Sequence, residues 1–451
     1  MAARKRSSSA AFANKVAPFA PLAIALAVGA GLSGGHPASM ESTPASPHTH
    51  TQMAAPSSIS GLAPLLQKGH PVDWWFVFKF NAKVFPGCGE GVQRACPFGG
   101  QPQPFPHFSQ QFAYASSDSA TLQQGSGCAG GSTGDAAPDP IGATFNEVYN
   151  GSFHFVVWND QFYDAPKIAG CTKECGAPWG HSKGLVAWDD SGQGLVMQVS
   201  TPDWPGAGSA STPRQDEANT LGCTTKDNDV QVSQHFFALR LSKDDLVQVL
   251  KGLQNASVVT DPKDPQIVKN GGPADVQQLV NSLGVRSSST TVLTSQLSTG
   301  VELISKPSNM KVPPWQMVSS ILGGIPLRTA TWWATPPIPS TTSSTVPGCW
   351  DSSLVKPPGP VDIATTGTWS GQVFGLKGGP GPDFNHAKLG VSTSTSDHYA
   401  IFGDMNQQGS LNGPNCGSSQ NGRGGTFYAV PDPELTTSLT SLIAGDSAPA
   451  K

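Results

Sequence analysis

The chain has 451 residues, a formal net charge of −4 and only 13% charged residues. This length is enough for two or three domains of the usual size. Proteins that coat nucleic acid irrespective of sequence generally have a basic balance, so the composition argues against a broad basic surface. Any contact with DNA must rest on a local cationic groove.

The N-terminal region has the features of an export signal. Residues 1–38 have a basic start, an apolar run rich in Ala and Leu, and small residues after it. Pro18 and Pro21 interrupt the apolar run, which is shorter than the roughly 20 residues of a membrane span. We therefore expect a cleaved signal peptide, no stable membrane association, and a secreted or periplasmic protein. Residues 39–65 are rich in Ser, Pro and Thr, which predicts a disordered linker.

The eight cysteines fit an oxidising compartment. Eight cysteines allow 105 pairings, and the sequence does not choose among them. No Cys-x-x-Cys pair is present and the spacing does not suit a structural zinc site, so disulfides are favoured over a metal. The cysteines are Cys88, Cys96, Cys128, Cys171, Cys175, Cys223, Cys349 and Cys416.

Strands and helices alternate along the chain, which predicts an α/β fold. Runs of β-branched and aromatic residues predict strands at 74–80, 152–158, 183–188, 194–199, 291–294, 301–305, 328–333, 388–392 and 399–403. Apolar periodicity predicts helices at 242–253, 273–283 and 315–322. Segments rich in Gly, Ser or Pro predict loops at 87–140 and 340–360, and a flexible tail at 433–451.

A His-x-Lys triplet occurs twice, as His181-Ser182-Lys183 and as His386-Ala387-Lys388. Side chains two residues apart on a strand project from the same face, so each triplet presents an imidazole beside an ammonium group. Each triplet is followed by a turn and a second apolar strand. We therefore expect two similar halves, 66–258 and 259–432, that bring both triplets to one site.

Several separated motifs resemble the deoxyribonuclease II family, which is related to the phospholipase D superfamily. They are Pro71 to Lys79, Gly180 to Val186, Pro202 to Pro205, His386 to Lys388, Gly403 to Asn406 and Gly422 to Thr426. The resemblance implies a phospholipase D-like fold: two halves, each a mixed β-sheet flanked by helices, form one pseudo-dimeric unit. It also implies an acid-favoured endonuclease on double-stranded DNA that needs no metal or other cofactor and leaves 3′-phosphate and 5′-hydroxyl ends.

The implied mechanism uses one histidine as nucleophile and the other as general acid and base. A nucleophilic histidine forms a covalent phosphohistidine and divides one difficult step into two. Lys183 and Lys388 would stabilise the charge on the phosphoryl oxygens. His181 is the favoured nucleophile, because the N-terminal motif has this role in the wider superfamily; His386 stays open as the alternative.

Three further residues are predicted to contact the substrate: Ser182, Asn406, whose amide donates hydrogen bonds, and Arg423, in a glycine-rich loop. The chain departs from the fuller phospholipase D motif, which places an Asp five residues after the Lys. Trp188 and Thr393 stand at those positions. The groups that orient the imidazoles are therefore open.

Two alternatives to a nuclease remain. A phosphodiesterase that acts on phospholipid would use the same constellation, although no polybasic patch marks a membrane surface. A secreted binding protein of the same fold without activity is the other alternative, although both His and both Lys are present.

Overall fold

The structure of the protein, a computed structural model, describes residues 61–81, 112–125, 129, 139–162, 167–168, 174–204, 211, 232–379 and 385–451. All of them lie in the second of two units into which the chain divides, Thr51–Lys451. The predicted signal peptide and most of the predicted linker fall outside the described residues. The end of that linker is described and differs from the expectation, because Leu62, Ala63 and Leu65 are buried.

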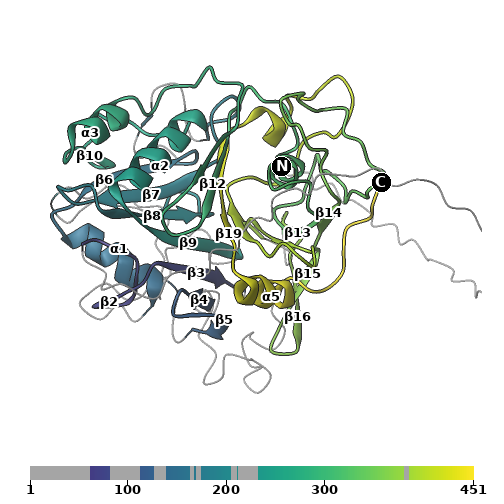
Figure 1. Cartoon of the computed structure of the whole chain (residues 1–451), viewed down its shortest axis with the longest axis horizontal. Helices are drawn as coiled ribbons and strands as arrows, with labels where there is room; N and C mark the ends of the chain where they lie inside the picture. Colours follow the sequence, from purple (N-terminus) through teal and green to yellow (C-terminus); the bar gives the residue numbers. More distant parts are fainter. Residues whose placement is uncertain are drawn as a thin grey trace, which may run out of the picture. The chain divides into compact units, whose positions relative to one another are not determined.

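The fold is mixed α/β, with two main sheets (Figure 1). In the described part of the chain the first sheet has eight strands in the order β10-β6-β7-β8-β9-β3-β4-β5, and all its pairings are antiparallel. Its strands are β3 (Trp74–Lys79), β4 (Phe112–Ser116), β5 (Ser119–Gln124), β6 (His154–Asn159), β7 (Lys183–Trp188), β8 (Gly194–Val199), β9 (Gln234–Leu241) and β10 (Val268–Lys269).

The second sheet has seven strands among the described residues, in the order β11-β12-β19-β18-β17-β13-β14. It is mixed, because β13 and β14 pair in parallel and the other neighbours are antiparallel. Its strands are β11 (Leu293–Gln296), β12 (Glu302–Lys306), β13 (Leu327–Ala330), β14 (Val361–Ile363), β17 (Leu389–Ser392), β18 (Ala400–Gly403) and β19 (Gly425–Val430). Two small hairpins pair β1 (Leu65–Gln67) with β2 (His70–Pro71) and β15 (Thr366–Trp369) with β16 (Gln372–Gly375).

Part of the strand order is repeated in the two sheets. The run β6-β7-β8-β9-β3 corresponds to β13-β17-β18-β19-β12, with each strand at the same place in chain order. A helix precedes β6 and another follows β9, and the same is true of β13 and β19. The helices are α1 (Pro140–Asn150), α2 (Lys243–Asn255), α3 (Ala274–Asn281), α4 (Pro314–Ile321) and α5 (Pro433–Leu442), with a 3-10 turn η2 (Ser419–Gly422).

The two sheets share one hydrophobic core. Aromatic rings from both sheets stack, with 4.6 Å between the ring centroids of Phe76 and Phe402 and 4.5 Å between those of Phe237 and Phe402. All three side chains are fully buried. These rings join the two sheets across the core.

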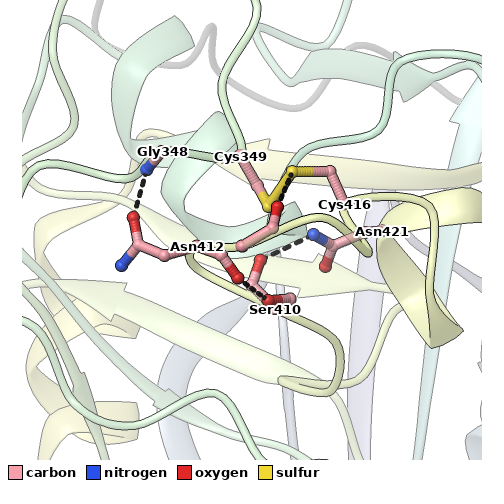
Figure 2. Close-up of a disulfide and its surroundings, with 7 residues drawn as sticks. Gly348, Cys349, Ser410, Asn412, Cys416 and Asn421 are labelled. Atoms are coloured by element: carbon pink, nitrogen blue, oxygen red, sulfur yellow. Dashed lines mark hydrogen bonds between the residues drawn. A yellow bond between two sulfur atoms is a disulfide. The ribbon is translucent and has the colours of Figure 1, made fainter.

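A disulfide fixes the loop that leads into η2. Cys349 is bonded to Cys416 across 67 residues of sequence (Figure 2). Nearby, the Gly348 amide donates to the Asn412 side chain at 2.6 Å, and the Asn421 side-chain amide donates to the Ser410 carbonyl at 2.7 Å. Cys175 is also disulfide-bonded. The other five cysteines lie outside the described residues: Cys88, Cys96, Cys128, Cys171 and Cys223.

Two segments differ from the sequence-based expectation. The tail predicted at 433–451 is ordered: Asp432 caps α5, whose Leu435 and Leu439 are fully buried, and Ala450 forms a bridge with Ser340. Within the predicted loop at 87–140, residues 112–124 form the β4-β5 hairpin. The first sheet also extends to Lys269, beyond the predicted boundary between 258 and 259.

Among the described residues, no helix has the length and apolarity needed to cross a membrane. The Cys349–Cys416 disulfide is consistent with an exported protein.

Candidate active site

The first His-x-Lys triplet lies at the start of β7 and is held by the backbone that precedes β19 and by the backbone that follows α2. The His181 amide donates to the Gly424 carbonyl at 2.8 Å, and the Gly180 amide donates to the Ser257 carbonyl at 2.9 Å. A Cβ at Gly180 would lie 2.6 Å from the Ala256 carbonyl oxygen, so this close approach requires glycine. His181 thus sits where the two sheets meet.

The second triplet has the corresponding support from the first sheet. The His386 amide donates to the Ser233 carbonyl at 2.8 Å. The Lys388 amide donates to Nδ1 of His235 at 3.0 Å, and His235 is fully buried on β9. Each triplet is therefore anchored by the strand end of the opposite sheet, which the strand order brings to the same place.

The charges of the two triplets act on each other. Burial lowers the pKa of His181 well below its ordinary value, and among the nearby cations both Lys183 and Lys388 lower it further. Burial likewise lowers the pKa of His386, and Lys388 and then Lys183 add to the effect. Each imidazole thus lies within electrostatic reach of the lysine of the other triplet, and the four side chains form one cationic site.

His181 is oriented by a backbone carbonyl. Its Nδ1 lies 2.6 Å from the carbonyl oxygen of Asp404. A carbonyl oxygen only accepts, so Nδ1 carries the hydrogen and the lone pair of the neutral ring is on Nε2. The Asp404 carboxylate is fixed in turn by the Thr426 amide and hydroxyl, each at 2.7 Å. Burial raises the pKa of Asp404 to about 6.

His386 is oriented by side chains. Its ring packs on Trp332, with 4.8 Å between centroids, and its Nδ1 lies 3.4 Å from Nε2 of Gln234. The Ser200 hydroxyl donates to Oε1 of Gln234 at 2.5 Å. Because Oε1 is the acceptor of that bond, the amide nitrogen of Gln234 faces the imidazole.

Asp160 is the residue of the site that the sequence motifs do not contain. It follows β6 and is fully buried, with its carboxylate 2.6 Å from Nζ of Lys183 and 2.8 Å from Nη2 of Arg423. Burial alone would raise the pKa of Asp160, but Lys183, His181 and Arg423 outweigh it and hold the pKa well below the usual range. The sequence shows that Asp160 follows an apolar strand. It does not show that this strand, β6, pairs with β7 and so places Asp160 beside Lys183.

The three predicted substrate contacts are buried and bonded to protein. Arg423 donates from Nη2 to Asp160 and to the Gly180 carbonyl at 2.7 Å, and from Nε to the Trp179 carbonyl at 3.1 Å. Ser182 accepts from the Trp158 indole at 2.8 Å. The Asn406 amide donates to Gln408 at 3.0 Å, and its Oδ1 is buried and has no hydrogen-bond partner among the described residues.

Within the described ranges, no group of three or more His, Cys, Asp or Glu side chains is arranged to hold a metal ion. The cationic side chains that act on His181 are Lys183, Arg423 and Lys388, and those that act on His386 are Lys388, Lys183 and Lys79.

Two comparisons with known proteins bear on this site. The family model described as Deoxyribonuclease II matches residues 64–445, which include both His-x-Lys triplets as well as β19 and α5. No curated protein matches the chain.

Proposed function

The chain belongs to the deoxyribonuclease II family, acid hydrolases of DNA phosphodiester bonds, and we propose that it is a metal-independent endonuclease on double-stranded DNA. The observation that carries the proposal is the convergence of His181, Lys183, His386 and Lys388 within reach of each other's charges. Two imidazoles and two ammonium groups supply a nucleophile, a proton donor and a stabiliser for an anionic phosphorane.

The proposed architecture is a phospholipase D-like pseudo-dimer of two similar halves within one chain. It is supported by the repeated strand order and by two matched hydrogen bonds, from the His181 amide to Gly424 and from the His386 amide to Ser233. In such an arrangement a pseudo-twofold axis passes between the triplets, so one phosphodiester meets both.

The proposed reaction has two balanced steps. Nε2 of His181 attacks phosphorus, the bond from phosphorus to the 5′ oxygen breaks, and protonated His386 gives its proton to that oxygen. His386, now neutral, takes a proton from water, whose oxygen attacks phosphorus and displaces His181. The products are a 5′-hydroxyl and a 3′-phosphate, and both histidines return to their starting states.

Lys183 and Lys388 hold the non-bridging oxygens of the phosphate in both steps. Asp160 acts through Lys183, because its carboxylate holds the ammonium group, and Arg423 holds the other oxygen of that carboxylate. Ser182 stands between His181 and Lys183 in the first triplet. Asn406, two residues after the Asp404 carbonyl that accepts from His181, remains a proposed donor to phosphate.

The test is cleavage of supercoiled plasmid by the mature protein in excess EDTA, at about pH 5 and pH 7.5. We expect cleavage in chelator, faster at the acid pH, and its loss in His181→Ala and in His386→Ala. His70→Ala is the control, because the His70 side chain is half exposed and pairs with Asp118 away from the site. The product ends should block primer extension until a phosphatase removes the 3′-phosphate.

Loss of cleavage on adding EDTA would overturn metal independence, and 5′-phosphate ends would overturn the proposed chemistry. Well-folded protein that leaves DNA intact at both pH values would favour the lipid phosphodiesterase or the inactive binding protein.

A further inference from the structure

The two histidines have unlike hydrogen-bond partners at Nδ1. His181 faces a backbone carbonyl, which accepts a hydrogen bond and never donates one. His386 faces the side-chain amide of Gln234, which presents either a donor or an acceptor according to which way it turns. The two histidines differ in this way even though the backbone hydrogen bonds around them are closely matched in the two halves.

The matched backbone contacts show which residues correspond. In the first half, Ser200 and His235 exchange hydrogen bonds, from the Ser200 amide to the His235 carbonyl at 3.1 Å and from the His235 amide to the Ser200 hydroxyl at 2.8 Å. In the second half, Asp404 and Thr426 do the same, at 3.0 Å and 2.7 Å. Ser200 therefore corresponds to Asp404, and His235 corresponds to Thr426.

It follows that Gln234, which precedes His235, corresponds to Gly425, which precedes Thr426. A Cβ at Gly425 would lie 2.6 Å from Cγ of Met405 and 3.2 Å from Cβ of Asp404, so the second half leaves no room for a side chain there. The first half therefore has a glutamine, Gln234, at a position where the second half has room only for glycine, Gly425. Only His386 therefore has an amide beside Nδ1.

We propose that Ser200 and Gln234 form a relay that converts His386 from a resting tautomer with hydrogen on Nε2 into a general acid whose Nδ1–H is held by Gln234, while the Asp404 carbonyl holds His181 in the single tautomer of a nucleophile. The assignment rests on the proposed two-histidine nuclease and adds to it which residues position the general acid and fix the tautomer of the nucleophile. Ser200 and Gln234 are positioning residues, since they act through His386.

The hydrogen bonds of the relay balance in both states. In the resting protein, neutral His386 carries its hydrogen on Nε2: the Ser200 hydroxyl donates to Oε1 of Gln234, and Nε2 of Gln234 donates to the lone pair on Nδ1. With protonated His386, which takes its second proton from solvent, the Gln234 amide turns over, so that Oε1 accepts from Nδ1–H and Nε2 of Gln234 donates to the Ser200 oxygen. Oε1 keeps Nδ1–H in place while Nε2 of His386 gives its proton to the 5′ oxygen, so the lone pair that then takes a proton from water is on Nε2. The Ser200 hydroxyl hydrogen then moves to the His235 carbonyl, which lies 3.2 Å away.

The charged and titratable groups around His386 all favour its neutral state in the free enzyme. Lys388 follows it in its own triplet, Lys183 faces it from β7, and Lys79 faces it from β3. His235 on β9 is buried and accepts from the Lys388 amide through Nδ1. An anionic phosphodiester counters the three ammonium groups, so substrate binding favours protonated His386, the state in which the relay turns over.

The first test reads the tautomers directly. Long-range ¹H–¹⁵N spectra of the mature protein at neutral pH, assigned with His181→Gln and His386→Gln, should give a hydrogen on Nδ1 of His181 and on Nε2 of His386. In Gln234→Glu, the carboxylate accepts only, so His386 should carry hydrogen on Nδ1 and stay protonated to higher pH. The same tautomer for both histidines in the wild type would overturn the proposal.

The second test is kinetic and uses plasmid DNA. Gln234→Leu removes both hydrogen-bonding groups at similar volume. It should lower kcat about 10- to 100-fold, part of the roughly 10²–10⁴ that a general acid contributes, and leave KM nearly unchanged. Gln234→Glu should move the alkaline limb of the pH profile upward, because protonated His386 persists. The control is Gln316→Leu, at a buried glutamine of α4 whose partner is Gln407.

An unchanged pH profile in Gln234→Glu, or equal losses in Gln234→Leu and Gln316→Leu, would overturn the relay. Failure of the wild-type protein to cleave DNA would overturn the proposed function instead, because the tautomers are read without turnover.

Discussion

The carboxylate of Asp160 lies 2.6 Å from the ammonium group of Lys183, and both side chains are almost completely buried. Arg423 contacts the other oxygen of the same carboxylate at 2.8 Å. One buried anion thus faces two buried cations next to His181, and it keeps Lys183 in place without neutralising the whole site.

Asp160→Asn should destabilise the protein strongly, because it leaves two buried cations without their anion. Removal of one partner from a buried ion pair costs about 3–5 kcal/mol, and urea unfolding at neutral pH would measure it. The control is Asp275→Asn, which breaks the exposed pair between Lys243 and Asp275 at 2.9 Å and should have no measurable effect. Equal unfolding midpoints for the two variants would refute this account of Asp160.

Asp404→Asn should extend both activity and stability toward neutral pH. Burial raises the pKa of Asp404 to about 6, above its ordinary value of 3.8. A raised carboxyl pKa contributes stability that is present below about pH 4 and is lost as the pH rises through about 6. The neutral amide avoids the buried charge and its repulsion of phosphate. The ratio of plasmid cleavage at pH 7 to that at pH 5 should therefore rise severalfold.

Asp244→Asn is the control for that variant, because Asp244 lies exposed in the first turn of α2. It should leave the ratio unchanged. A ratio for Asp404→Asn that equals the wild-type value would show that Asp404 does not set the alkaline limit of activity.

His235→Asn should reduce the loss of stability in acid. Burial lowers the pKa of His235 well below its ordinary value, and Lys388 adds to this. The unfolded chain binds a proton near pH 6.5 and the folded protein does not, so the stability is present above about pH 6.5 and falls as the pH drops toward the folded pKa. Asparagine keeps an acceptor for the Lys388 amide but does not titrate.

The measurement for His235→Asn is the free energy of unfolding in urea between pH 6.5 and pH 5. Its slope should become shallower by up to about 1.4 kcal/mol per pH unit. His70→Asn, at a half-exposed side chain, is the matched control. Identical slopes for wild type and His235→Asn would contradict the prediction.

Replacement of both Cys349 and Cys416 by alanine should cost about 4 kcal/mol of stability. The bridge spans 67 residues of sequence, and closure of a loop of this size restricts the unfolded chain by roughly that amount. The loop it fixes also contains Asn421, whose carbonyl accepts from Lys306 at 2.8 Å. Unfolding in urea measures the change, and a loss below about 1 kcal/mol would indicate that other contacts hold the loop.

Local signals in the sequence predicted much of the fold. The β7-β8 hairpin has its predicted bounds, because Asp189 accepts from the Ser191 amide at 2.8 Å and Gly192 takes a positive φ. Helix α2 begins after Ser242, which forms a capping box with Asp245. In both cases the determining contacts lie within a few residues.

Other elements lacked such a signal. Seven of the eight residues of β9 are buried, so the alternation that marks a half-buried strand is missing. Helix α5 is rich in Thr and Ser and depends on the Asp432 cap and on its buried leucines. The candidate site shows the same contrast between residues with a local signal in the sequence and residues without one. The His-x-Lys triplets are visible in the sequence, but Asp160 and Gln234 reach Lys183 and His386 through pairing between strands distant in sequence.

The most direct test of the central claim uses an activated substrate, thymidine 3′-(4-nitrophenyl phosphate), whose leaving group needs no general acid. His386→Ala should release one equivalent of nitrophenol per protein and then stall, because His181 forms the phosphohistidine but no base activates water. His181→Ala should give no burst. A burst from His181→Ala and none from His386→Ala would make His386 the nucleophile, and the absence of a burst from both would contradict a covalent intermediate.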